Sequence, residues 1–346
     1  MKKKFYILFL MFLCHGFLWA GNPDRQGEAG AYELLMNPWA RSAGVHSMST
    51  SFISGVESLR LNVAGLSRIN QFEAVVSHAI YLQGTDISMN ALGVASRVGK
   101  GAFGLSIMAL DFGDIEVTTT DQPEGTGATF SPNFFNIGIS YAHTFENKVS
   151  VGITLRGISE SISDLAAFGF AIDAGIQYVT GVQDNFKFGI SLRNVGSPMR
   201  FGGEGLATQV PAPNGKSYEL TLEQRSADFE IPSVLNIGLS YDFLPAEKNR
   251  LTLLGNFTAN SFSRDQLGAG FEYALDEKFM VRAAYRIELD APQEFEEPVY
   301  TGLSAGASVV FPLSKENKNT GLAIDYAYRP TRVWNGTHNI SVRINI

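Results

Sequence analysis

Strand-length segments in which apolar residues alternate with small or polar residues recur along this chain. In one of them, Phe135, Ile137 and Ile139 alternate with Asn136, Gly138 and Ser140. A period of two predicts a β-strand, and the same alternation marks 149–156, 186–193, 235–243 and 340–346. A soluble sandwich would carry Lys, Glu and Thr on its outward face, whereas the second face here is mainly Gly, Ser and Asn. The pattern is typical of a barrel that meets lipid outside and water inside.

The N-terminus has the pattern of a secretory signal peptide. Lysines at 2–4 precede an apolar run over 5–13, and small residues at Ala20 and the next position allow cleavage. We expect the cut after Ala20, which makes 1–20 the leader. A lipoprotein signal at Cys14 is disfavoured because a bulky leucine precedes it. Cys14 is the only cysteine, so the predicted mature chain forms no disulfide.

The predicted mature chain is acidic. Removing the leader takes away three of the 27 Lys and Arg residues and none of the 34 acidic residues, which leaves a formal charge of −10. We therefore expect no nucleic-acid partner. No segment after residue 20 has the roughly 18 apolar residues that a transmembrane helix needs, yet 45% of the chain is hydrophobic. A closed barrel reconciles these facts, because its sheet satisfies every backbone polar group. The prediction is an outer-membrane protein of a Gram-negative bacterium, surrounded by outer-membrane lipid.

The alternation predicts an all-β fold, a fourteen-stranded antiparallel transmembrane β-barrel over 71–346. The predicted strands are 72–82, 86–98, 101–119, 134–145, 148–160, 168–179, 185–196, 232–243, 249–260, 266–275, 278–288, 300–312, 320–328 and 338–346. An even number is expected of a bacterial barrel. Residues 21–70 lack a clean strand period, and we expect them to form a separate N-terminal segment, either periplasmic or folded into the barrel as a plug or hatch.

Loop lengths predict the orientation of the barrel. Bacterial barrels have short periplasmic turns and long external loops. The long connections follow odd-numbered strands and are 121–133, 161–167, 197–231, 289–299 and 329–337. This parity predicts that both termini lie in the periplasm. Within the longest connection, 218–224 could form a hairpin arm outside the membrane.

The sequence does not predict an enzyme, a cofactor or a metal site. Residues 302–306, Gly-Leu-Ser-Ala-Gly, match the nucleophile-elbow pattern, but that motif needs a strand-to-helix turn and these residues continue a predicted strand. The mature chain has four histidines, His46, His78, His143 and His338. The spacing of these histidines matches no metal-binding motif and singles out no serine–histidine pair of a hydrolase.

Charged residues also occur on the predicted inner face. The arginines there are Arg156, Arg193, Arg282, Arg286 and Arg343. They could form a selectivity ladder for anions or pair with Asp242 and Glu288 to fill the lumen, and we favour the second hypothesis. The acidic loop 288–297 is either solvated surface or a contact patch for a basic partner or divalent ions.

Three stretches carry a resemblance to a known family. The first is Ala-Arg-Ser-Ala-Gly at 40–44 followed by Asn-Val-Ala-Gly-Leu at 62–66, where the family usually has proline in place of valine. The second is the run 110–119 followed by Pro-Glu-Gly-Thr-Gly at 123–127. The third is Ile-Asp-Tyr-Ala-Tyr at 324–328, which leads to the last strand. In these stretches the chain resembles the PorV/PorQ outer-membrane proteins of the type IX secretion system, which are similar to the FadL class of fourteen-stranded transporters.

The resemblance implies a non-enzymatic component of type IX secretion. PorV-like members are understood to collect cargo proteins with a C-terminal secretion domain as they leave the translocon. They then deliver the cargo to the surface attachment complex, so translocon, attachment-complex and cargo proteins are the implied partners. The alternative is a FadL-like channel for hydrophobic small molecules, in which the N-terminal segment is a hatch. An outer-membrane hydrolase is a third and weaker hypothesis.

Long loops on a rigid scaffold tend to carry function, so the external segments 111–133 and 197–231 are the predicted partner surface. The candidate partner-binding residues are Asp114, Glu116, Pro123, Glu124, Phe130, Phe201, Pro211 and Pro213. The candidate hatch residues are Asn62, Ala64, Gly65 and Leu66.

Overall fold

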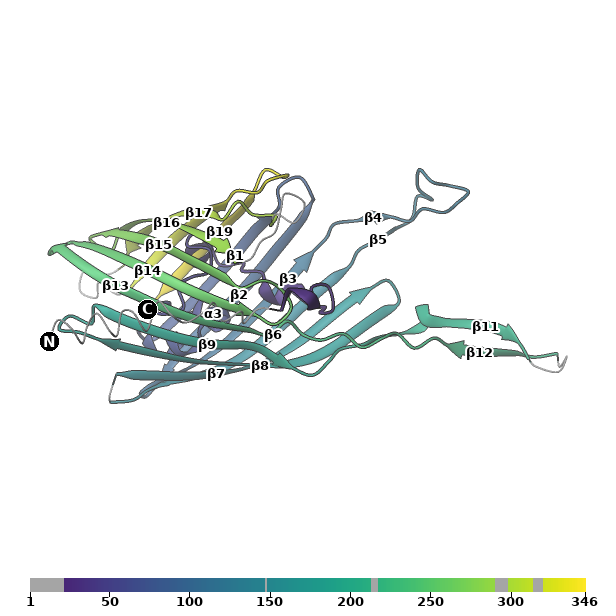
Figure 1. Cartoon of the computed structure of the whole chain (residues 1–346), viewed down its shortest axis with the longest axis horizontal. Coiled ribbons are helices and arrows are strands. Elements are labelled where there is room, and N and C mark those ends of the chain that lie inside the picture. Colours follow the sequence, from purple (N-terminus) through teal and green to yellow (C-terminus); the bar gives the residue numbers. More distant parts are fainter. Residues whose placement is uncertain (1–21, 147, 213–216, 290–297, 314–319) are drawn as a thin grey trace, which may run out of the picture.

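The computed structural model describes residues 22–146, 148–212, 217–289, 298–313 and 320–346, and these form a closed antiparallel barrel of 14 strands (Figure 1). The predicted leader 1–20, Pro213 and residues 290–297 of the acidic loop lie outside the described residues. The barrel strands are β1 (Phe72–Tyr81), β2 (Ile87–Val98), β3 (Gly101–Asp111), β6 (Asn133–Thr144), β7 (Val149–Ile162), β8 (Leu165–Thr180), β9 (Phe186–Gly196), β13 (Val234–Ala246), β14 (Asn249–Asn260), β15 (Gln266–Leu275), β16 (Phe279–Glu288), β17 (Leu303–Pro312), β18 (Gly321–Arg329) and β19 (Thr337–Asn345).

Each barrel strand pairs with its neighbours around the ring, and β1 pairs with β19 to close it, with Val75 opposite Arg343. The predicted strand boundaries agree with the structure to within three residues, except at the end of the third strand. The sequence predicts that this strand runs to 119, but β3 ends at Asp111. There the Asp111 carboxylate accepts a hydrogen bond from the Gly113 N–H at 2.9 Å, and Gly113 adopts a φ of +71°. This turn geometry favours glycine and ends the strand.

The two faces of the barrel wall differ as the alternation predicts. On β6, Ile139 is 62% exposed on the outer face, while Ser140, the next residue, is 2% exposed on the inner face. Ile139 lies opposite Leu105 of β3 and Leu155 of β7, which also face outward. A continuous apolar band therefore surrounds the barrel, as lipid contact requires.

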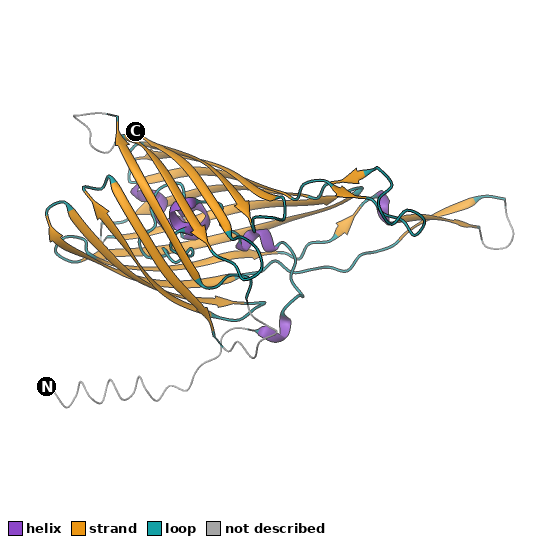
Figure 2. Cartoon of the chain, turned by 90° about the horizontal axis from the view of Figure 1, so that it is seen from above, coloured by secondary structure: helices purple, strands orange, loops and turns teal. Residues whose placement is uncertain are grey.

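Residues 31–69 lie inside the barrel (Figure 2), and we name them the inner segment. This segment contains η2 (Tyr32–Leu35), α2 (Ala40–Ala43), α3 (Ser58–Leu61) and η3 (Val63–Arg68). Its backbone is hydrogen-bonded to the wall, since the Ala40 N–H donates to Ser341 Oγ at 2.9 Å. No helix in the described ranges is long and apolar enough to cross a membrane.

The inner segment and the wall share one apolar core. Trp39, Leu59 and Leu66 of the segment pack with Met89 and Leu110 of the wall, and all five are buried. Close packing against the inner segment explains why the inward-facing side chains of the wall are small. A Cβ added at Gly93 would lie 2.3 Å from Val56, and one added at Gly175 would lie 2.1 Å from Asn62 Oδ1.

The two ends of the described chain lie at opposite ends of the barrel. The Gly30 N–H donates to the Glu230 carbonyl at 3.0 Å, in the connection between β9 and β13, at the long-loop end. The Ile346 N–H donates to the Phe72 carbonyl at 2.9 Å, at the short-turn end where β1 begins. No observation places either end relative to the membrane, so the predicted periplasmic location of both termini stays a prediction.

Candidate functional site

The first arm, residues 111–133, leaves the barrel between β3 and β6. In it, β4 (Ile115–Glu116) pairs with β5 (Thr129–Phe130), and the Val117 N–H donates to the Ala128 carbonyl at 2.8 Å. At its base, Ser131 Oγ donates to the Gly113 carbonyl at 2.8 Å. The residues that the sequence predicts as strand continue as this hairpin, which extends beyond the barrel (Figure 1).

The first arm is acidic and open to solvent. It contains five acidic residues and no Lys or Arg. Four of its candidate residues, Asp114, Glu116, Pro123 and Glu124, are exposed, whereas Phe130 is half-buried. The exposed Ile115 adds an apolar side chain that the sequence analysis did not single out. The arm therefore offers acidic and apolar groups together.

The base of the second arm, residues 197–231, is anchored to the barrel. Met199 and Phe229 exchange backbone hydrogen bonds of 2.8 and 2.9 Å, and β10 (Phe201–Gly202) pairs with β8. The Phe201 ring lies 5.6 Å from that of Phe229 and packs against a buried cluster that includes Leu34. Phe201, a candidate partner residue, is thus half-buried in the anchor.

An exposed ion pair also lies at this base. Arg200 donates to both carboxylate oxygens of Asp228, at 2.6 and 2.9 Å. This bond lowers the pKa of Asp228 and raises the pKa of Arg200. The pair joins the two chains of the arm at its base, next to the backbone bonds between Met199 and Phe229.

The outer part of the second arm is a hairpin. The strands β11 (Ala207–Pro211) and β12 (Glu219–Glu223) pair with Pro211 opposite Glu219, which confirms a hairpin in the region predicted at 218–224. Pro211 is exposed. Tyr218 and Leu222 are 52% and 50% exposed and were missed as candidates. An apolar–polar alternation in a segment outside the membrane was the signal that could have found them.

Both arms project from the same end of the barrel, on different sides of it (Figure 1). The structure thus brings the candidates of the two arms to one end without placing them in a single cluster. Exposed β-hairpins carry strand edges with unpaired N–H and C=O groups.

The candidate hatch residues lie deep in the inner segment. The Asn62 amide donates to the carbonyls of Thr50 and Ile176 at 2.9 and 3.1 Å, and its oxygen accepts the Ala64 N–H at 3.2 Å. Ala64 and Leu66 are fully buried. At Gly65, an added Cβ would lie 2.1 Å from the Ile53 carbonyl oxygen, so only glycine fits. Asn62 joins the segment to β8, while Ala64 lies against Gly152 of β7 and Leu66 against Gly104 of β3.

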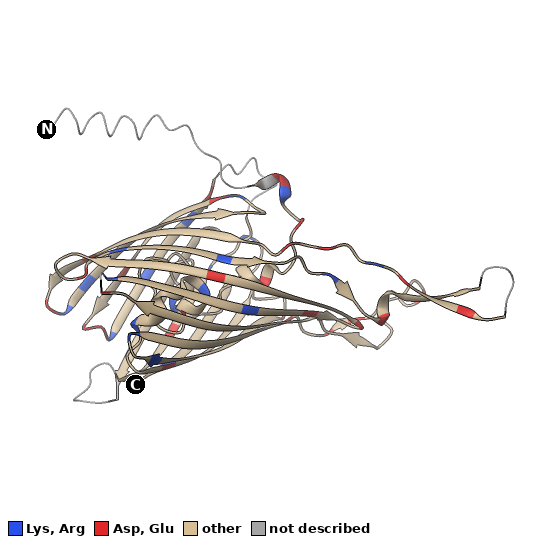
Figure 3. Cartoon of the chain, turned by 90° about the horizontal axis from the view of Figure 1, so that it is seen from below, with Lys and Arg blue, Asp and Glu red and all other residues tan. Residues whose placement is uncertain are grey.

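The inward-facing arginines fill the lumen, which confirms the favoured hypothesis. Lys and Arg lie on the same barrel strands as Asp and Glu (Figure 3). Arg156 pairs with Asp173 at 2.7 Å, and Arg282 pairs with Glu272 at 3.0 Å, with all four side chains at most 5% exposed. The predicted partner Asp242 instead accepts from Lys187. The other, Glu288, accepts from Gln266 at 3.2 Å and lies within electrostatic reach of Arg286 without an ion pair. The partner of each arginine depends on strand register, which the sequence does not contain.

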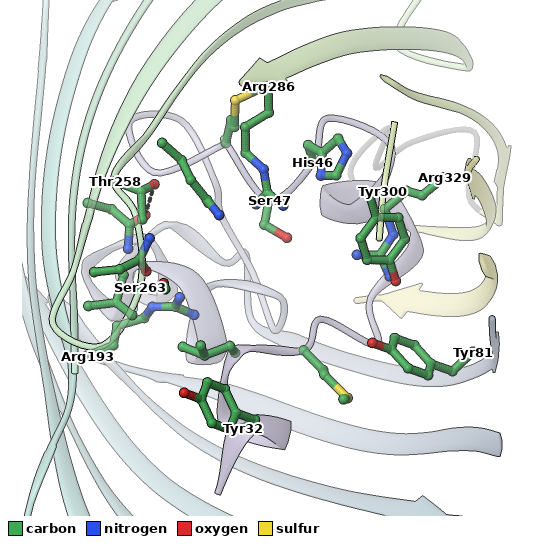
Figure 4. A pocket seen from close by; sticks show the side chains of 17 residues that line it. Tyr32, His46, Ser47, Tyr81, Arg193, Thr258, Ser263, Arg286, Tyr300 and Arg329 are labelled. Atoms are coloured by element: carbon green, nitrogen blue, oxygen red, sulfur yellow. Dashed lines mark hydrogen bonds between the residues drawn. The ribbon is translucent and has the colours of Figure 1, made fainter. Parts of the chain in front are cut away.

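A cavity of about 260 Å³ lies between the inner segment and the strand ends at the long-loop end (Figure 4). Its lining includes Arg193, Arg286 and Arg329 from the wall and His46 from the inner segment. The sequence analysis named three of these four residues but not Arg329. That residue shares the inward face of β18 with Asp325 and Ala327, so the alternation contained the signal.

The nucleophile-elbow match has no catalytic geometry. Ser304 lies within β17, is 3% exposed, and donates to the Gly44 carbonyl at 3.1 Å. The ring of His78 contacts Asn90 at 2.8 Å and the ring of His338 contacts Tyr326 at 2.8 Å, both on the exposed face. In the described residues, no three His, Cys, Asp or Glu side chains gather to hold a metal ion.

Comparisons with known proteins agree with this geometry. A sequence model for the family described as "Type IX secretion system membrane protein PorP/SprF" matches residues 86–344, a range that includes both arms. A search of curated proteins gives no match. Among solved structures, the fold is similar to that of the CymD monoaromatic hydrocarbon channel, with a TM-score of 0.58, 15% identity, and coverage of 90% of this chain and 98% of that one.

Two further structures share the fold. The Pseudomonas putida toluene transporter TodX has a TM-score of 0.54 and 16% identity over 87% of this chain and 95% of that one. A Pseudomonas aeruginosa FadL homologue has a TM-score of 0.55 and 12% identity over 89% of this chain and 98% of that one. At such identities the likeness shows the fold alone, and it confirms the FadL-like barrel.

Proposed function

The chain belongs to the PorP/SprF family of type IX secretion system membrane proteins, and we propose that its two arms bind secreted cargo at the cell surface. Family and fold make it an outer-membrane component of type IX secretion. The finer role proposed is that of PorV-like members, to receive cargo with a C-terminal secretion domain from the translocon and deliver it to the attachment complex. The observation that carries the proposal is the projection of both arms from the long-loop end of a barrel whose lumen is occupied by its own chain.

The chemistry of the arms suggests what the partner surface offers. The first arm is uniformly acidic, so it would attract a basic face, and complementary charge speeds and orients association. Ile115, Tyr218 and Leu222 supply exposed apolar contacts. The free edges of the two hairpins can accept a strand of the partner, a common way to bind an extended segment.

A FadL-like channel for hydrophobic compounds is the alternative. The hydrocarbon channels among the similar structures support it only through the fold. Against it stands the polar lumen, in which buried ion pairs such as Arg156–Asp173 would line the path of an apolar solute. We propose that the inner segment closes the barrel in the resting protein.

The test is to trim each arm at a point where the structure already joins its two strands. In the first arm, 114–130 are replaced by a two-residue turn above the Gly113–Ser131 contact. In the second, 207–223 are replaced above the bond from the Gln224 N–H to the Leu206 carbonyl, which measures 2.9 Å. Each variant is expressed in a strain lacking the gene. Surface attachment of cargo and capture of a purified C-terminal secretion domain are then measured.

We expect either trimmed protein to lose cargo capture while the barrel still shifts on gels after heating. A charge-matched pair of variants tests the acidic contribution. Neutralising Asp114, Glu116, Asp121 and Glu124 removes four charges from the first arm. Neutralising Glu146, Asp184, Glu247 and Asp276 removes four from the short turns at the other end, and this second variant should bind cargo normally. Normal secretion with both arms trimmed, or impaired uptake of a hydrophobic nutrient alone, would contradict the proposal and favour the channel.

A further inference from the structure

The cavity at the long-loop end carries an excess of positive charge. Arg193, Arg286 and Arg329 line it, and its described lining contains no Asp or Glu. In Figure 4, Arg193 lies on one side of the cavity, with Thr258 and Ser263. Arg329 lies on the opposite side, with Tyr300. Arg286 lies between the two sides, with His46 and Ser47. Glu288 lies within electrostatic reach of Arg286, and Asp173 of Arg193, but among the described residues none of the three cavity arginines forms an ion pair. Arg156, deeper in the lumen, pairs with Asp173 at 2.7 Å.

Two buried donors at the cavity are left without a partner. The Nε–H groups of Arg193 and Arg329 have no hydrogen-bond partner among the described residues, and the donor bond of Arg193 runs from its Nη1 to the Arg60 carbonyl at 2.7 Å, away from a carboxylate. These two side chains are 9% and 6% exposed. Arg329 makes one long hydrogen bond, 3.4 Å to Asn339, and its guanidinium lies 5.0 Å from the centre of the Tyr300 ring. Native proteins rarely leave buried donors unmatched, and guanidinium groups match carboxylate and phosphate best.

The remaining lining offers amides, hydroxyls and aromatic rings. Asn236, Asn260, Thr258 and Gln266 come from β13, β14 and β15, and the phenols of Tyr81 and Tyr300 come from the opposite side. Asn236 Oδ1 already accepts from Thr258 at 2.8 Å, which leaves its amide N–H₂ to donate. At about 260 Å³ the cavity is smaller than the roughly 300–1,000 Å³ typical of drug-sized ligands. Its size suits a single sugar-sized molecule.

We propose that this cavity binds an acidic sugar, a monosaccharide-sized molecule that carries one carboxylate or phosphate group. The acidic group contacts the guanidiniums of Arg286 and Arg329, and the sugar hydroxyls contact the amides and hydroxyls of β13 to β15. The site is distinct from the arms, so it goes beyond cargo binding and does not depend on it. The shared chemistry is an oxyanion on a hydroxylated ring, and the source can be a uronic acid or a sugar phosphate.

Calorimetric titration of the purified, detergent-solubilised full-length barrel tests the proposal without cargo. The probes are glucuronate, glucose 6-phosphate, neutral glucose, benzoate and inorganic phosphate. We expect glucuronate or glucose 6-phosphate to bind at least tenfold more tightly than glucose, benzoate and inorganic phosphate. The better of the two identifies the acidic group. Failure of both to bind at 10 mM, or equal affinity for glucose or benzoate, would overturn the assignment.

Variants separate the site from the rest of the protein. Arg286→Met should weaken binding of the preferred probe by tenfold or more, while Arg286→Lys, which keeps the charge, should retain part of it. Gln266→Leu, on the hydroxyl side, should weaken sugar probes several-fold, which keeps the test valid if Arg286→Met does not fold. Lys248→Gln removes an exposed charge from a short turn at the other end of the barrel and should leave probe affinity unchanged. Unchanged affinity in both Arg286→Met and Gln266→Leu would show that the probe binds elsewhere.

Discussion

Replacing Asn62 by aspartate tests whether the inner segment is held by specific hydrogen bonds or merely by filling space. Asn62 is 1% exposed, and its amide N–H₂ donates to the carbonyls of Thr50 and Ile176. Aspartate keeps the oxygen that accepts the Ala64 N–H but loses both donors. The Thr50 carbonyl keeps the Gln177 amide as a donor at 2.9 Å, so the cost comes from the two lost bonds and from burying a carboxylate in place of an amide. Together these should cost about 2–4 kcal/mol of local stability.

Hydrogen exchange measured by mass spectrometry on the folded barrel is the assay. If the segment opens locally, Asn62→Asp should accelerate exchange of amides in 50–69 by roughly 30- to 1,000-fold, and barrel-strand amides should be unaffected. Asn335→Asp makes the same change at an exposed position in the loop between β18 and β19 and should leave exchange unaltered. Equal protection of 50–69 in Asn62→Asp and the native protein would refute the idea that these bonds hold the segment in place.

Two further predictions concern the wall and the top of the inner segment. Ile139→Arg places a charge in the outward apolar band and should cost about 2–4 kcal/mol of folding stability near the bilayer midplane. His143→Arg lies nearer the strand end and should cost about 0–1 kcal/mol. Refolding yield into lipid vesicles, measured by the heat shift on gels, should therefore fall much more for Ile139→Arg, and equal yields would contradict the prediction. Burial, and then the neighbouring Glu160 carboxyl, raises the pKa of Glu33 to about 8. Because the folded state holds that proton more tightly, the inner segment should lose stability as pH rises from about 4.3, the ordinary glutamate value, toward 8. Glu33→Gln should weaken this dependence, and burial of Glu57, which also raises its pKa, should keep part of it. The assay is acrylamide quenching of the buried Trp39 in a Trp334→Phe background, and an unchanged pH profile would count against the prediction.

The sequence predicts the barrel wall well because one physical constraint sets it. A lipid-facing row of apolar residues must repeat every second position, so Ile137, Ile139 and Tyr141 locate both the strand and its outer face. The third strand is the exception. Val117 and the threonines after it have high strand propensity, and the propensity is real, since these residues continue as a hairpin. The turn at Asp111 and Gly113 directs that hairpin away from the wall.

The inner face was harder to interpret, because small polar residues suit a wet lumen and a packed one equally. Ser140 was expected to face water, but it is 2% exposed and hydrogen-bonded to Thr154 at 2.7 Å. Only the opposing surface distinguishes the two cases, and that surface comes from residues far away in sequence. The partner of Arg156 was unpredictable for the same reason, since Asp173 reaches it through the register of β7 against β8.

The chemistry of the lumen bears on how a barrel of the hydrocarbon-channel fold can serve secretion. A channel for apolar solutes needs an apolar path, and a charge without its partner in that path is costly to bury. Here Arg156 is bound to Asp173 and also to the Leu59 carbonyl of the inner segment, at 3.2 Å, so the wall's charges hold the segment in place. Displacing the segment would break such bonds along its whole length. These bonds favour the role proposed above, in which the barrel is a closed platform and a large partner binds the acidic and apolar side chains of the two arms.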